Sequence, residues 1–497
     1  MNKKNQQLFR CFAFVIVISI ILQSCKTPIK TEGLQGNSVK NLIVMIPDGC
    51  SIELLQLARL YKAYPNSPDN TVLSFDSLIC GLLKVNTATT VMGESAANAT
   101  AIFTGVKTKP GYLATDTTGN ELSSVFSLAR DIKNKAIGIV GTVDLAQATL
   151  SAPLIHSKNR GDYNDIIKQL AYNGADVLFA SGGKGFINRD FTKKDNNINT
   201  IRKDKLNLED VVTKDKNIHL CFYKKDFDNI DTTNYHKIWW LYNSESNCMP
   251  NDFDRADTVP SLSEMTLKAI SILKHNKNGF VLLVEGSKID WAAHSNDPIG
   301  VLSEFLAFEK AVEVALKFAR EDKNTAVIIM PDHGTGGITI GNQNSNAESN
   351  NNYHKLNYKD FGNPIFINKN KLYTGEGLRK ILKYKTDSII AFYKAKNLKD
   401  CPSNAQIFLK KFINNIYSIS FSDEDIETLI KNVNLSDNDF ADIFGPIYSK
   451  YTYIGWTTNG HTGEDVFMAI YHPKNYVKKG IINLTEITEY IKEILKL

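Results

Sequence analysis

The sequence lacks the charge excess and the internal repeats that mark several large classes of protein. Its 497 residues carry a net charge of only +5, and three of the basic residues, Lys3, Lys4 and Arg10, lie in the first ten positions. Without these three the net charge is about +2, too small for strong polyelectrolyte binding, so nucleic acid is not an expected partner. The apolar share of 43% in a chain of this length allows a large buried core.

Cysteine is scarce as well, with seven residues in the whole chain. Cys11 and Cys25 fall near the N-terminus, and the other five are Cys50, Cys80, Cys221, Cys248 and Cys401. Their spacing matches neither a zinc knuckle nor a CxxC pair, so no cysteine metal site is expected. One or two disulfides would be compatible with an exported protein, and a Cys50–Cys80 pair stays open at this stage.

Long apolar runs are missing too, and the run from Cys11 to Leu22 is too short for a comfortable membrane span. It follows a basic start and precedes Leu22-Gln23-Ser24-Cys25, which resembles a bacterial lipobox, so residues 1–25 are predicted to be a lipoprotein signal peptide. A plain signal peptide cut nearby is the alternative. Residues 26–38 are polar, as in a tether. We therefore expect a protein of the periplasm or cell surface, held to a membrane through a lipid on Cys25.

What the sequence does contain is a series of short, continuously apolar runs, each followed by polar residues. The runs lie at 41–46, 136–140, 176–180, 279–284, 325–330 and 465–471. Continuous apolar runs are typical of strands covered on both faces, and residues 261–276 and 303–322 have helical periodicity between them. The alternation predicts an α/β fold with a large, mostly parallel sheet and helices on both faces. Ligands of such sheets bind at the carboxyl ends of the strands.

Two segments interrupt this alternation. Residues 184–258 are rich in Lys, Asp and Asn and, apart from the apolar patch 238–241, lack a long periodic pattern. The whole segment, patch included, is predicted to be irregular surface excursions at the rim of a site. Residues 341–450 begin with an Asn-rich run and continue with helical patterns at 377–396, at 404–418 and from Ser422 onward. We interpret residues 341–450 as an inserted helical subdomain, and residues 39–340 plus 451–497 as the catalytic domain.

Ser95 stands where a turn can run into a helix, in the stretch "GESAANATAIFTG". A hydroxyl at that junction lies near the unpaired N–H groups and the positive end of the helix dipole, which suit an anion such as phosphate. An isolated serine in this position usually only caps its helix. Acidic residues and histidines at the strand ends make a chemical role the better interpretation.

Those acidic residues and histidines form a recurring pattern. They are Glu285, Asp290 and His294 in "EGSKIDWAAH", Asp332 and His333 in "PDHGTGG", and His461 in "GHTGEDV". Asp290 and His294 are four residues apart and would share one helix face. Carboxylate and neutral imidazole are good zinc ligands, and three protein ligands with an open position are typical of a catalytic zinc.

Seven motifs together carry a family resemblance. They are "MIPDG" with Asp48, "GESAANATAIFTG" with Ser95, "LAQATLSA" with Thr149, "HSKNRGDY" with Arg160, "EGSKIDWAAH", "PDHGTGG" and "GHTGEDV". In this order they resemble the motifs of the metal-dependent alkaline phosphatase family, over roughly residues 40–340 and 451–475. In that family two zinc ions and one magnesium ion surround a serine nucleophile.

The resemblance implies a ligand set for each ion. One zinc would be held by Asp290, His294 and His461; the other by Asp48, Asp332 and His333, with the Ser95 oxygen as an exchangeable ligand; and magnesium by Asp48, Thr149 and Glu285. The magnesium ligands are all oxygen donors, as that hard ion prefers.

The resemblance also implies roles for residues that hold no metal. Ser95 would be the nucleophile, and Arg160 would grip two phosphoryl oxygens, with Glu94 as its partner where most members have Asp. Trp291 would line the substrate mouth or pack in the core. Gln147 stands where members carry an acid or a histidine, which leaves the metal preference of the third site open.

The sequence thus predicts an alkaline phosphatase that hydrolyses phosphomonoesters through a phosphoserine and releases inorganic phosphate. A related phosphodiesterase and a non-catalytic lipoprotein that binds phosphorylated ligands are the alternatives. Ser95 and Glu285 argue against the diesterase, and the complete set of candidate zinc ligands argues against the binding protein. The oligomeric state is open, a homodimer being one option.

Overall fold

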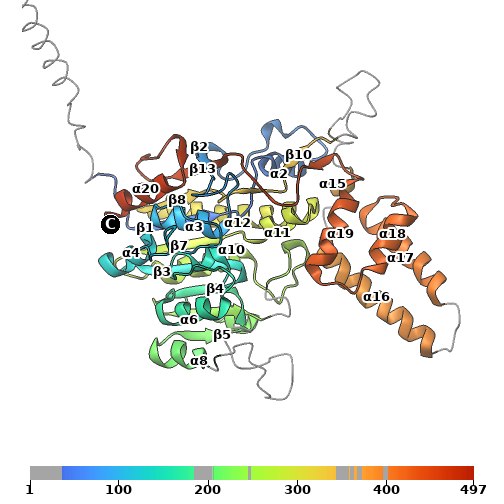
Figure 1. Ribbon diagram of the computed structural model, residues 1–497, viewed down its shortest axis with the longest axis horizontal. Coiled ribbons are helices and arrows are strands. Elements are labelled where there is room, and N and C mark those ends of the chain that lie inside the picture. Colours follow the sequence, from blue (N-terminus) through green and yellow to red (C-terminus); the bar gives the residue numbers. More distant parts are fainter. Residues whose placement is uncertain are drawn as a thin grey trace, which may run out of the picture. The chain divides into compact units, whose positions relative to one another are not determined.

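A ten-stranded sheet is the central feature of this computed structural model (Figure 1). Its strands are β1 Asn41–Ile46, β2 Ile79–Lys84, β3 Ala136–Asp144, β4 Val177–Ser181, β5 His219–Cys221, β6 Ile238–Tyr242, β7 Phe280–Glu285, β8 Thr325–Ile329, β13 Val466–Tyr471 and β14 Gly480–Asn483. They lie in the order β14-β2-β13-β8-β1-β7-β3-β4-β6-β5. Within this sheet β13 runs antiparallel to β2 and β8, and the remaining neighbours are parallel. The predicted α/β fold is confirmed.

The structure describes residues 36–183, 204, 206–243, 248–342, 358, 363–366, 372–395 and 401–497. The chain divides into a unit of residues 1–38 and a unit of residues 39–497, and the second contains the helices and strands that the structure describes. The predicted signal peptide and most of the predicted tether lie outside the described residues. None of the helices that the structure does describe is both long enough and apolar enough to span a membrane.

Helices pack on both faces of the sheet, because successive strand side chains point to opposite sides. Along β1, Ile43 and Met45 belong to one buried cluster, and Leu42, Val44 and Ile46 to the other. The first cluster is covered by α2 Glu53–Ala63, α10 Leu262–Leu273 and α12 Pro298–Asp322. The second is covered by α3 Ser95–Thr104, α4 Val125–Lys133, α6 Tyr163–Asn173 and α20 Thr485–Leu495. Both faces of β1 are therefore buried from solvent, which explains its continuously apolar sequence.

One prediction about the sheet is wrong. The apolar patch of residues 238–241 is not part of a surface excursion, because β6 pairs in parallel with β4 and β5 extends the sheet beyond it. Trp239 and Trp240 are fully buried, one in each hydrophobic cluster. Burying two large side chains favours a place for this segment inside the sheet. The polar residues on either side of it make the strand difficult to predict from the sequence.

Within the predicted insertion, residues 341–450, the described part includes the helices α16 Gly375–Ala395, α17 Cys401–Tyr417, α18 Asp423–Lys431 and α19 Asp437–Ser449 (orange in Figure 1). It leaves the core after β10 Ile338–Ile340 and returns at β11 Ile454–Trp456, and these two short strands pair antiparallel. The two ends of the insertion are thus held side by side by backbone hydrogen bonds.

Several short elements complete the described chain. They are α5 Ala148–Ser151, α8 Leu208–Asp210, α9 Lys224–Asp228, α11 Lys288–His294, α15 Asn363–Phe366, β9 Gly334–Thr335, β12 His461–Thr462, the 3-10 turns Pro68–Asn70, Asp76–Leu78 and Asp252–Asp254, and the π-helical turn Val211–Asp215. Cys50 and Cys80 are both thiols, so the disulfide that the sequence left open between them is not formed.

Candidate active site

Three neighbouring parallel strands bring four of the predicted residues to one edge of the sheet. Asp48 follows β1, Glu285 ends β7, and Asp332 and His333 follow β8, with β1 lying between β7 and β8. All four are buried. The backbone N–H of Gly49 donates to Oδ1 of Asp332 at 3.2 Å. The parallel topology therefore assembles this part of the site directly.

Ser95 is the first residue of α3, and its side chain faces these strand ends. It is 4% exposed, and its Oγ lies 3.2 Å from Nε2 of His333. Glu94 caps the helix by accepting from the backbone N–H of Ala97 at 3.0 Å. Asn98, one turn further on, donates to the carbonyl of Asp332 at 2.7 Å. This last bond ties the start of α3 to the end of β8 and so holds Ser95 against His333.

A second group of ligand candidates comes from α11 and β12. Asp290 and His294 share one side of α11, and Nε2 of His294 lies 3.3 Å from Oδ2 of Asp290 and 3.1 Å from Nε2 of His461. β12 pairs with β9, which follows His333 directly, so the rings of His461 and His333 stack with centroids 3.9 Å apart. The two predicted zinc sites are therefore adjacent.

Gly49 makes the approach of α11 to β1 possible. Its φ of +68° lies in the left-handed region that glycine tolerates, and a Cβ there would meet Oδ1 of Asp290 at 2.6 Å. The glycine of "PDG" thus lets Asp290 lie against the backbone that carries Asp48.

Arg160 is held by two side chains. Its Nη1 forms an ion pair with Oε1 of Glu94, and its Nη2 donates to Oε1 of Gln147 at 3.3 Å. Gln147 in turn donates from Nε2 to the hydroxyl of Tyr163 at 2.8 Å. Sequence reasoning missed Tyr163, although its place at the first position of α6, three residues after Arg160, was a usable signal.

Two further predicted residues have distinct surroundings. Thr149 is buried in α5, which packs against β7, the strand that ends in Glu285. Trp291 is half-buried and packs against the second hydrophobic cluster, which is the packing role that the sequence left open. Its role at a substrate mouth stays a prediction.

The buried carboxyl groups repel one another. Burial, followed by the charges of Asp332, Asp290 and Glu285, raises the pKa of Asp48 well above its ordinary value. Burial likewise raises the pKa of Glu285 to about 8. Burial opposes the charged form of His294, but the adjacent Asp290 carboxylate raises the pKa of that imidazole to about 9. Such crowding of acids is relieved by a bound cation.

Comparison with known protein families shows which family the chain belongs to. A family model described as alkaline phosphatase matches residues 39–497. The chain belongs to the alkaline phosphatase family. It is 30% identical to alkaline phosphatase 3 of Bacillus subtilis over 493 residues, which cover 94% of this chain and 91% of that protein. It is 31% identical to alkaline phosphatase 4 of the same organism, over 92% and 89% of the two chains. The prediction of an enzyme of this class is confirmed.

Solved structures agree on the fold. A cold-active alkaline phosphatase from a psychrophilic Shewanella species superimposes with a TM-score of 0.72 at 24% identity, covering 92% of this chain and 99% of that one. The Thermus thermophilus enzyme gives 0.70 at 21% identity, with 95% of each chain covered. The large sheet with helices on both faces is therefore that of the family.

The donor atoms fit the metals that the resemblance implies. The ligand atoms of Asp290, His294 and His461 lie within 4.8 Å of one another, as do those of Asp48, Asp290 and His333. Asp332 stands beside the second group, with Oδ2 3.3 Å from Nε2 of His333. Imidazole and carboxylate donors so close together suit zinc.

Each of the three predicted magnesium ligands has a buried side-chain oxygen. Among the residues that the structure describes, Oδ1 of Asp48, Oγ1 of Thr149 and Oε2 of Glu285 are buried without a hydrogen-bond partner. An unpaired buried oxygen is costly, and oxygen ligands of this kind suit a hard cation such as magnesium.

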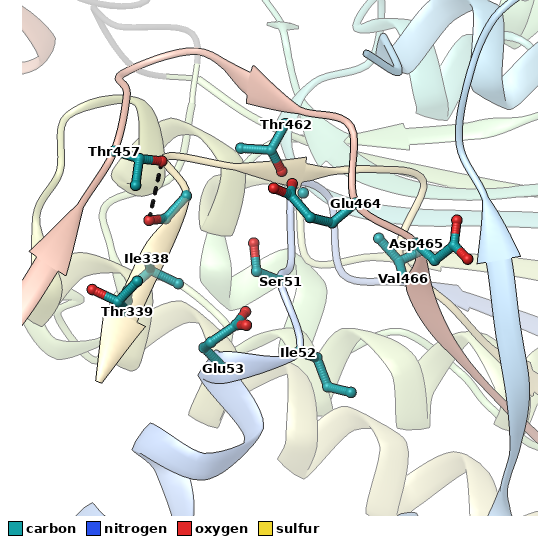
Figure 2. Close-up of a pocket in the computed structure, with 12 residues that line it drawn as sticks. Ser51, Ile52, Glu53, Ile338, Thr339, Thr457, Thr462, Glu464, Asp465 and Val466 are labelled. Atoms are coloured by element: carbon teal, nitrogen blue, oxygen red, sulfur yellow. Dashed lines mark hydrogen bonds between the residues drawn. The ribbon is translucent and has the colours of Figure 1, made fainter. Parts of the chain in front are cut away.

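Two hollows adjoin the site without containing its nucleophile. One has a volume of about 160 Å³. Ser51, Glu53 and Glu464 line it together with Thr462, the residue after His461 (Figure 2). None of the predicted site residues lines it. A second hollow, of about 360 Å³, is bordered by His294 and by Asp442 and Pro446 of α19. The insertion therefore reaches the immediate neighbourhood of a predicted zinc ligand.

Proposed function

We propose that this protein hydrolyses phosphomonoesters through a phosphoserine intermediate on Ser95, with two zinc ions and one magnesium ion. The observation that carries the proposal is the position of Ser95. Its buried Oγ lies at a helix N-terminus, 3.2 Å from His333, within a cluster of candidate metal ligands.

The chain's own residues would bind and orient the phosphoryl group. The guanidinium of Arg160 uses one N–H on Glu94 and another on Gln147, and each of these nitrogens carries a second N–H that can donate to a phosphoryl oxygen. The backbone N–H groups at the start of α3 add positive potential. The ion pair between Glu94 and Arg160 links the guanidinium to the N-terminus of α3, because Glu94 also caps that helix.

The reaction would proceed in two displacements. Ser95 Oγ attacks phosphorus as the alcohol leaves, and water then attacks the phosphoserine to release inorganic phosphate and restore the hydroxyl. Bound zinc ions would lower the pKa of the serine hydroxyl and of the water and neutralise the leaving oxygen, while magnesium would fix the carboxylates around them.

A rate comparison tests this function. The chain from residue 38 would be assayed at pH 8 to 9 with a chromogenic phosphomonoester and a chromogenic phosphodiester, with zinc and magnesium and then with a chelator. We expect fast monoester turnover that the chelator abolishes, and little diester turnover. Folded, zinc-loaded protein that hydrolyses only the diester would establish the diesterase alternative, and protein that hydrolyses neither would contradict any phosphatase role.

We also propose that the chain is exported and anchored through a lipid on Cys25. The support is the leader: a basic start, an apolar run and Leu22-Gln23-Ser24-Cys25. Metabolic labelling with a fatty acid should mark the wild-type protein and not the Cys25→Ser variant. Equal labelling of both, or of neither, would contradict the anchor.

A further inference from the structure

The inserted helices contact the metal-ligand helix α11 at both of its ends. α11 spans Lys288–His294 and carries Asp290 and His294. Its first residue contacts the start of α16, and the residues just after its end contact α19. These contacts join segments that lie more than 80 residues apart in the chain.

The first contact is a buried ion pair. The Lys288 side chain is 1% exposed, and its Nζ donates to both carboxylate oxygens of Glu376, at 2.7 and 2.8 Å. A third bond, of 3.0 Å, goes to the carbonyl of Met249. Each of the three N–H groups of the Lys288 ammonium thus has an acceptor, and none is left for another partner. Removing either partner would leave a buried charge unpaired.

The start of α16 is itself fixed to the core. The backbone N–H of Gly375 donates to Oδ2 of Asp297 at 2.9 Å, and Asp297 is the residue that caps α12, the helix that follows α11. Thr374 donates from its hydroxyl to Asp254 and accepts from Asn251. Glu376 is therefore presented to Lys288 from a rigid turn.

The second contact lies directly after His294. The hydroxyl of Ser295 donates to Asp442 of α19, and the hydroxyl of Ser449 donates to the carbonyl of Asn296 at 3.2 Å. Gly445 packs so closely on Ser295 that an added Cβ would clash with its carbonyl oxygen. The end of α11 is thereby pressed against α19.

We propose that the inserted helices are a positioning element for the metal site, and that Glu376 and Asp442 set the zinc affinity of Asp290, His294 and His461 without touching the metal. The inference rests on the proposed function, since it assumes that these three residues hold zinc. Groups that orient metal ligands typically change affinity by about tenfold or more. Binding is reciprocal, so zinc should also stabilise α16 and α19.

A matched pair of variants separates positioning from general stability. Glu376→Gln breaks the contact with Lys288, whereas Asp437→Asn breaks the pairs that Asp437 makes with Arg379 and Lys380 inside the insertion. Zinc dissociation constants would be measured by chelator competition, and melting temperatures of the zinc-free proteins would be measured alongside. We expect Glu376→Gln to weaken zinc binding about tenfold or more and Asp437→Asn to change it less than twofold.

Two further measurements keep the test decisive if Glu376→Gln fails to fold. Asp442→Asn is a milder change at the other end of α11, and it should also weaken zinc binding. Hydrogen exchange of α16 and α19 in the wild-type protein should slow when zinc is added. The positioning role alone would be overturned by two results together: Asp442→Asn binds zinc as tightly as the wild type, and zinc leaves the hydrogen exchange of α16 and α19 in the wild type unchanged. A wild-type chain that binds no zinc would overturn the proposed function as well.

Discussion

Arg160 and Gln147 are joined by a hydrogen bond, with Nη2 of the arginine 3.3 Å from Oε1 of the amide. The same amide donates to the hydroxyl of Tyr163, so Gln147 bridges the two residues. The amide uses its oxygen as the acceptor for Arg160 and its nitrogen as the donor to Tyr163. The neutral residue at this position therefore helps to hold the arginine, whatever its effect on the third metal site.

Replacing Gln147 by Ala should loosen Arg160. A lost hydrogen bond of this kind is worth about 1 kcal/mol, so we expect KM and the inhibition constant of phosphate to rise roughly fivefold while kcat changes less. Steady-state kinetics with phosphate as competitive inhibitor measures both constants. Tyr163→Phe, which keeps the bond between Gln147 and Arg160, should show a smaller rise. A fall in kcat alone, with KM unchanged, would contradict this role.

Much of the site could be predicted because its chemistry follows the strands. Asp48, Glu285 and Asp332 each end an apolar run, and in a parallel sheet such ends meet at one edge. The partners of Lys288 and Arg160 could not be predicted in the same way. Lys288 and Glu376 are 88 positions apart, and no local pattern links them. β6 was missed for a related reason, because the burial of Trp240 depends on Phe227 and Tyr242 packing around it.

Metal removal should lower stability. If zinc binds the folded chain and not the unfolded one, raising free zinc to about 100 times its dissociation constant should add about 2.7 kcal/mol to the free energy of unfolding. Denaturant unfolding with zinc and with chelator measures this difference. Asp290 belongs to both groups of candidate ligands, the one with His294 and His461 and the one with Asp48 and His333. The Asp290→Asn variant should therefore show a smaller difference in the free energy of unfolding. Superimposable wild-type curves under the two conditions would contradict a metal site.

Asp254 should make stability fall as the pH rises. Burial raises its pKa from 3.8 to about 7 in the folded protein, so the folded state binds this proton more tightly than the unfolded state. Stability is therefore lost between about pH 4 and pH 7, the interval between the two pKa values. Asp254→Asn should remove this loss and gain about 1 to 3 kcal/mol relative to the wild type on going from pH 5 to pH 8.

Denaturant unfolding of both proteins at the two pH values, with chelator present, measures that gain. Chelator keeps metal binding from adding its own pH dependence. A difference between variant and wild type that is the same at pH 5 and pH 8 would show that Asp254 does not titrate in this range.

The central claim is that Ser95 carries the phosphoryl group during turnover. The most direct measurement mixes the zinc- and magnesium-loaded enzyme with a phosphomonoester, stops the reaction with acid and locates the phosphate by peptide mass spectrometry. We predict phosphate on Ser95 in the wild type, and in Ser95→Ala no phosphopeptide and a rate reduced by far more than tenfold, since tenfold is only about 1.4 kcal/mol of barrier. A Ser95→Ala enzyme that retains a tenth or more of the wild-type rate would contradict the account.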